Sequence, residues 1–296
     1  MHKIYFILAM MAAVTLVSCD TEDALTPSNI DTDIFNTKEG ATDEESVLRN
    51  DFFKTTGSYL LFNDTLSNGE LLDIGYVMTS MENNDVYVYD YLSTIEEKEK
   101  AVNFVQNYIL PHLGEKLRPF SFLLVNNITH YNKNGKEYYQ NYDDSDNPTS
   151  VVGVRATALA MGSIAYMEED ELQMYSKNVL KGILTYIISK QTSDTYKQFY
   201  NYGKDYYKEY IDVSWDIPEE ENLKIMNEKG FICSHYAYGM LFPGYYPTDT
   251  EDVAAYIDLV MNSTAEEVEE TYRSYPDIIS KYQIMAKLMK ELGYVE

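Results

Sequence analysis

Residues 172–188 read LQMYSKNVLKGILTYII. Their apolar side chains recur at three- and four-residue intervals, the spacing that puts them on one face of an α-helix. That face comprises Leu172, Tyr175, Val179, Leu180, Ile183, Leu184, Ile187 and Ile188. The stretch therefore predicts a buried amphipathic helix, and after Glu168 the chain changes from strand-like to helical patterns.

Upstream of this helix, short runs rich in β-branched and aromatic residues favour β-strands. They lie at 59–62, 71–78, 86–91, 120–125 and 151–164. One helix is expected among them, at 95–110, with Thr94 as its N-cap and Glu97 completing a capping box. A polar loop is expected at 130–150.

Downstream, the helical pattern continues. Further helices are expected at 194–210, 218–229, 249–261, 264–272 and 276–292. Strands first and helices after indicate the α+β class. We therefore expect a single domain over residues 46–296, with an N-terminal mixed β-sheet and one helix followed by a helical C-terminal half.

The N-terminus has the pattern of an export signal. Lys3 precedes an apolar run from Ile4 to Val17, which is shorter than the roughly 20 residues of a membrane-spanning helix. The run ends in Leu16-Val17-Ser18-Cys19, which looks like a bacterial lipobox. We interpret residues 1–18 as a lipoprotein signal peptide and Cys19 as the acylated residue that anchors the chain to a membrane. A plain secretory signal with an incidental cysteine is the alternative.

Residues 19–45 are acidic and poor in aromatic side chains, so we expect a flexible, lipidated tether. The whole chain has a formal net charge of −25. This charge argues against nucleic acid as a partner and against electrostatic docking on anionic lipid. Cys233 is the only cysteine besides Cys19, so the mature chain is expected to have no internal disulfide.

One region resembles a known family. The segment 229–237 reads KGFICSHYA, and the segment 250–257 reads TEDVAAYI. Together they are similar to the zinc-binding metallopeptidase lipoproteins, which pair a Gly-Phe-containing stretch with a helix start of the type EDFAE. The segments 110–113 and 288–293 are also similar. The resemblance implies a zincin-like fold. Members of this family resemble companions of outer-membrane nutrient-uptake systems, so the resemblance also implies that this protein lies at the outer membrane.

The catalytic motif of that family is missing. A His-Glu-x-x-His helix would place two imidazoles and a water-activating carboxylate around zinc. At the equivalent place this chain has Thr185-Tyr186-Ile187-Ile188-Ser189, and Ala255 stands where the second motif has an acid. We therefore expect a pseudoenzyme without a catalytic site or a zinc cofactor.

Two alternatives remain open for the site. A rearranged zinc peptidase would use His235, Glu251 and Asp252 as metal ligands, whereas the plainer interpretation makes Cys233 and His235 packing residues. The 29 tyrosines suggest a binding surface for a peptide, a protein or a glycan. The candidate ligand-binding residues around the Pro- and Gly-containing loop are Tyr236, Tyr238, Phe242, Tyr245 and Tyr246.

Overall fold

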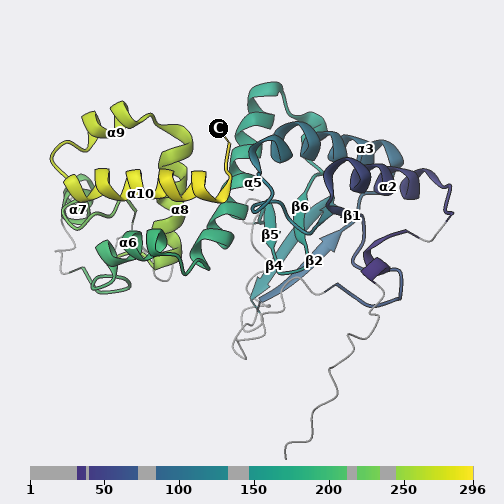
Figure 1. Ribbon diagram of the computed structural model, residues 1–296, viewed down its shortest axis with the longest axis horizontal. Helices are drawn as coiled ribbons and strands as arrows, with labels where there is room; N and C mark the ends of the chain where they lie inside the picture. The colour runs from purple at the N-terminus through teal and green to yellow at the C-terminus, as the bar shows by residue number, and fades with distance from the viewer. Residues whose placement is uncertain are drawn as a thin grey trace, which may run out of the picture. The chain divides into compact units, whose positions relative to one another are not determined.

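The computed structural model describes residues 32–37, 40–72, 85–132, 147–211, 219–233 and 245–295 (Figure 1). The chain divides into two units, Met1–Ile34 and Phe35–Glu296. Of the first unit, only residues 32–34 are described, at the start of a 3-10 helix, η1 (Thr32–Phe35). The expected signal peptide, Cys19 and most of the expected tether lie outside the described residues.

A four-stranded mixed sheet forms the centre of the N-terminal half, in the order β1-β3-β6-β5. Its strands are β1 (Tyr59–Leu61), β3 (Ser121–Val125), β5 (Ser150–Val152) and β6 (Thr157–Ala160). Strand β3 is parallel to both β1 and β6, and β5 runs antiparallel to β6. Every residue of β3 is buried, as its continuous apolar run predicts.

A separate two-stranded ribbon pairs β2 (Asp85–Asp90) with β4 (Asn127–Asn132) in antiparallel fashion. Strand β2 was expected, whereas β4 overlaps the start of the expected loop at 130–150. Tyr87 lies opposite His130, and their rings stack at 5.0 Å. Of the strand expected at 71–78, residues 73–78 lie outside the described residues, and Leu71 forms only an isolated bridge with Thr65.

The N-terminal half contains more helix than expected. Helix α2 (Glu44–Thr56) was not predicted, because Phe52 is its only buried side chain and its apolar pattern is correspondingly weak. Local caps define it instead: the Asp43 side chain accepts a hydrogen bond from the Ser46 amide, and Gly57 ends it with φ +75°. In Figure 1 α2 lies beside α3 (Ile95–Phe104), with which it is in contact.

The folded part of the chain also begins earlier than Ser46. Phe35 is buried, with its ring edge-on to Phe120 at a centroid distance of 5.1 Å. The Arg49 guanidinium donates to the carbonyl oxygens of Phe35 and Leu60. The expectation of a tether that extends to residue 45 is therefore wrong at its C-terminal end, because the Phe35 ring packs against Phe120 beside the sheet.

Helix α3 has the expected capping box between Thr94 and Glu97. It continues as a π-helix, η2 (Val105–Ile109), and a 3-10 turn, η3 (Leu110–His112). After the turn η5 (Ile164–Tyr166), the long helix α5 (Glu169–Ser189) confirms the helix expected from residues 172–188.

The C-terminal half is helical, as expected. It contains α6 (Asp194–Gly203), α7 (Glu219–Asn227), α8 (Asp249–Asn262), α9 (Ala265–Thr271) and α10 (Pro276–Leu292). Only α6 ends well before its expected end at residue 210. A Cβ atom on Gly203 would come within 2.7 Å of the Tyr207 ring and 2.8 Å of the Phe231 ring, so the chain turns in a tightly packed place. The sheet half and the helical half together confirm the α+β class.

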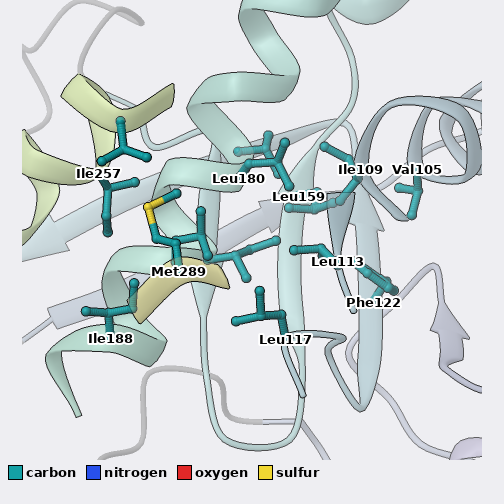
Figure 2. Close-up of a cluster of buried hydrophobic side chains, with 14 of the residues drawn as sticks. Val105, Ile109, Leu113, Leu117, Phe122, Leu159, Leu180, Ile188, Ile257 and Met289 are labelled. Atoms are coloured by element: carbon teal, nitrogen blue, oxygen red, sulfur yellow. The ribbon is translucent and has the colours of Figure 1, made fainter. Parts of the chain in front are cut away.

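One continuous hydrophobic core joins the two halves. Figure 2 shows Phe122 and Leu159 from the sheet, Leu180 from α5, and Ile257 and Met289 from α8 and α10. Helix α5 lies at the junction, since it contacts β5 and α8. Among the described residues, no helix has both the length and the apolar character needed to cross a membrane.

Candidate functional site

The N-terminus of α8 positions the two acids that the sequence offered as alternative metal ligands. Thr248 and Glu251 form a capping box, in which the Glu251 carboxylate accepts from the Thr248 amide at 2.8 Å. Glu251 therefore caps its own helix. Asp252, the next residue, points to the interior and is 0% exposed.

Asp252 forms an ion pair with Lys281 of α10, whose side chain is also completely buried. Lys281 Nζ lies 2.8 Å from Asp252 Oδ1 and 2.7 Å from Oδ2, and it donates a third hydrogen bond to the Gly230 carbonyl at 2.7 Å. The Tyr207 hydroxyl donates to Asp252 Oδ2 at 2.8 Å. All three ammonium hydrogens thus have acceptors, as a buried charge requires.

Three aromatic rings surround the Lys281 ammonium. Its nitrogen lies 4.8, 4.7 and 4.4 Å from the ring centroids of Phe199, Phe231 and Tyr256. Each distance is within the range of a cation–π interaction. The Tyr256 hydroxyl also donates to the Gly230 carbonyl, at 2.9 Å. The rings exclude water and add to the attraction that holds the ammonium in place.

Burial shifts the titration of this group of residues. It raises the pKa of Asp252 and lowers the pKa of Lys281, while the opposite charge of each partner counteracts the shift. Burial, with the charge of Asp252 second, raises the pKa of Tyr207 well above the usual range. The result is a solvent-excluded ion pair in which both carboxylate oxygens of Asp252 already accept hydrogen bonds from the protein.

Cys233 lies close to this ion pair. Its thiol donates to the Glu251 carbonyl at an S···O distance of 3.6 Å. Burial, with the charge of Asp252 second, raises the pKa of Cys233 to about 12. Since thiolate is the form that attacks electrophiles and binds metals, this raised pKa disfavours both roles for the half-buried Cys233. His235, its expected neighbour in a site, lies outside the described residues.

The segment Thr185–Ser189, where the metallopeptidase motif would fall, is at the C-terminal end of α5. The hydroxyl oxygens of Thr185 and Ser189 are buried, and among the residues that the structure describes they have no hydrogen-bond partner. Ile188 is fully buried, as expected. Ile187 and Tyr186 are only half-buried and line a groove of about 340 Å³, where Tyr186 stacks under the Lys190 ammonium at 4.2 Å.

These side chains do not suit zinc. Neutral hydroxyls such as those of Thr185 and Ser189 are not among the usual zinc ligands, and Asp252 already pairs with an ammonium. In the described part of the chain, no group of three or more His, Cys, Asp or Glu side chains is arranged to hold a metal ion.

The expected aromatic binding residues fall into different environments. Tyr246 is buried in a small core with Ile211, Met226 and Phe231. Its place in this core makes it a packing residue. Tyr245 is 37% exposed and meets Tyr210 edge-on at 5.6 Å. Tyr236, Tyr238 and Phe242 lie outside the described residues.

A cleft of about 900 Å³ lies elsewhere, between the π-helix η2, the first half of α5 and the turn from α8 to α9. The sequence did not indicate it, because its walls come from segments far apart in the chain and carry no shared motif. It is lined by Asn107, Tyr108, His112, Glu169, Gln173, Ser176, Lys177, Leu180, residues 260–265, Glu267, Tyr282 and Tyr294.

Hydrogen bonds within and between its walls hold the polar side chains of the cleft. Tyr108 Oη donates to Glu169 Oε2 at 2.7 Å, and Gln173 Nε2 donates to Glu169 Oε1 at 3.1 Å. On the other side, Lys177 Nζ donates to Asn262 Oδ1 at 2.8 Å. The hydrogen bond to Glu169 raises the pKa of Tyr108. These contacts preorganise a polar surface that is open to solvent.

Comparison of the chain with models of protein families finds no match, and neither do searches of curated proteins and of solved structures.

Proposed function

We propose that this protein is a lipid-anchored envelope lipoprotein without catalytic activity, a divergent relative of the zinc-binding metallopeptidase lipoproteins. Its role is to bind a peptide, protein or glycan partner at the outer membrane, beside a nutrient-uptake system. The lipobox before Cys19 supports the anchor. The resemblance of the segments 229–237 and 250–257 supports the relationship.

The absence of catalysis rests on one observation. Both carboxylate oxygens of Asp252 lie within 2.8 Å of Lys281 Nζ, in a place that no solvent reaches. A zinc site using Asp252 would have to break this pair and leave a buried ammonium without its counter-charge, which is strongly unfavourable. The cleft beside α5 provides a preorganised surface for binding instead.

The test is elemental analysis of protein purified without chelator, together with a cleavage assay on casein and a peptide library. We expect far less than one zinc per chain and no cleavage that a chelator abolishes. About one zinc per chain, with chelator-sensitive cleavage that is lost in His235→Ala, would establish the rearranged peptidase instead. The matched control is Glu266→Ala, which removes an exposed acid on α9 and should leave any such cleavage unchanged.

A further inference from the structure

The cleft beside α5 combines three kinds of side chain on one surface. Tyr108 and Tyr294 contribute aromatic rings, Gln173 and Asn262 contribute planar amides, and Glu169 contributes a carboxylate. Rings of this kind pack against apolar C–H faces, while amides and carboxylates pair with neighbouring hydroxyl groups as donors and acceptors. A ligand that matches all three has alternating C–H faces and hydroxyl groups.

The polar groups are held in place but keep hydrogen-bonding capacity. The Gln173 amide can make four hydrogen bonds, and among the described residues its contact with Glu169 is one of them. The Tyr108 ring is fixed from behind, since it stacks on Phe104 with centroids 5.3 Å apart and planes inclined by 19°. A ligand would therefore meet a rigid surface, which lowers the entropic cost of binding.

The charges of the cleft select against an anion. Among the described residues that line it are the carboxylates of Glu169 and Glu267 and a single lysine, Lys177, whose ammonium is already bonded to Asn262 Oδ1. The chain as a whole carries a net charge of −25. An acidic ligand would meet repulsion both locally and at long range.

The shape and walls of the cleft select against a peptide strand. A common way to bind an extended peptide is to add it to the edge of a sheet, whereas the described walls here come from helices, among them α10 through Tyr282, and from the turn between α8 and α9. One carbonyl group of the turn already has a partner from the protein: that of Ser263 accepts from the Tyr282 hydroxyl at 3.0 Å. The volume of about 900 Å³ is at the upper end of ordinary ligand sites, large enough for several linked rings.

We propose that this cleft binds a neutral oligosaccharide. The inference rests on the proposed binding function and names the ligand class and the residues that contact it. Tyr108 supplies a stacking face, and Gln173 and Asn262 supply hydrogen bonds to hydroxyl groups. The exposed Tyr210–Tyr245 pair lies outside this cleft and is not needed for binding.

The experiment uses the full lipidated chain, purified in a detergent that has no sugar head group. Its probes are a panel of neutral oligosaccharides, a panel of uronate-containing oligosaccharides and a peptide library, with binding measured by calorimetry. We expect saturable binding of at least one neutral oligosaccharide. Gln173→Ala should weaken it about fivefold and Tyr108→Ala about tenfold, through loss of a hydrogen bond and of a stacking face.

Gln198→Ala is the matched control, because Gln198 is also an exposed glutamine on a helix but lies outside the cleft. It should leave the affinity unchanged, and circular dichroism should show that all variants are folded. Equal affinity in Gln173→Ala, Tyr108→Ala and the wild type would overturn the site. Binding of peptides or acidic glycans only, or of no probe, would overturn the ligand class. Zinc-dependent cleavage would instead overturn the proposed function itself.

Discussion

Lys281 and Asp252 form an ion pair in which neither side chain has any exposed surface, with Nζ 2.7 Å from Oδ2. Two helices, α8 and α10, meet through this contact, and the Gly230 carbonyl that follows α7 accepts from the same ammonium. The pair therefore connects three parts of the helical half. The contribution of each partner to the stability of the fold can be measured by substitution.

Lys281→Met should destabilise the protein strongly, because it leaves the Asp252 carboxylate buried without a counter-charge. We expect the free energy of unfolding in urea to fall by about 3–5 kcal/mol, and a similar loss for Asp252→Asn. The double variant Lys281→Met/Asp252→Leu should recover much of the loss, since it removes both charges together.

The control for this prediction is Lys197→Met, which removes the lysine of the exposed Lys197–Asp194 pair. It should change the unfolding free energy by less than about 1 kcal/mol. Equal losses in Lys281→Met and Lys197→Met would show that the buried pair does not stabilise the fold.

Cys233 should react very slowly with thiol reagents in the folded protein. Burial raises the pKa of Cys233 from 9.0 to about 12, so at pH 8 the reactive thiolate is rare. In a Cys19→Ala background, the rate of modification by a disulfide reagent should rise by at least roughly a hundredfold on unfolding in urea. Fast, complete labelling of the folded protein at pH 8 would contradict the raised pKa of this thiol.

The same group makes stability depend on pH at the alkaline end. Because the folded pKa lies above the unfolded one, the proton on Cys233 stabilises the folded state fully below pH 9. This contribution is lost as the pH rises from about 9 towards 12. A Cys233→Ala variant, compared with the parent by urea unfolding at pH 8 and pH 10, should lose less stability over this interval.

Phe35→Ala should test where the folded part begins. Phe35 is 4% exposed, and the Arg155 guanidinium lies 5.0 Å from its ring centroid. Removing a buried phenyl ring typically costs about 3–5 kcal/mol, which we expect as an upper range here. Val47→Ala, at a 45% exposed position of α2, should cost less than about 1 kcal/mol. If Phe35→Ala caused no measurable loss of stability, the folded part of the chain would begin near Ser46 after all.

If Cys19 is lipidated, its substitution should remove the protein from the membrane fraction. Cys19→Ala should abolish incorporation of labelled palmitate and release the protein from the membrane fraction, because the anchor that we propose is the acylated thiol. Cys233→Ala should keep both properties and serves as the control. A Cys19→Ala protein that still labels and still pellets with membranes would show that the lipobox interpretation is wrong.

Patterns within a few residues predicted much of the secondary structure. The apolar face of 172–188, the continuous run in β3 and the Thr94 capping box are all local, so each could be interpreted from neighbouring residues. Helix α2 was missed for the same reason. It buries only Phe52, and its limits are set by Asp43 and Gly57, which carry no periodic signal.

The candidate site was less accessible to sequence reasoning. Glu251 was expected as an alternative metal ligand, and it caps α8. Tyr246 was expected in a binding surface, and it packs in a small core. In both cases the residue type allowed two roles, and only its neighbours in space distinguish them.

The sequence alone determined the class of the fold and the absence of a His-Glu-x-x-His motif, because both depend on residue identity and short-range spacing. Only the tertiary structure decided that Asp252 pairs with Lys281, 29 positions away, and that Tyr108 meets Glu169, 61 positions away. Such contacts depend on how whole helices pack, and no local pattern encodes that packing. The same packing creates the cleft beside α5, whose walls become one surface only when the chain is folded.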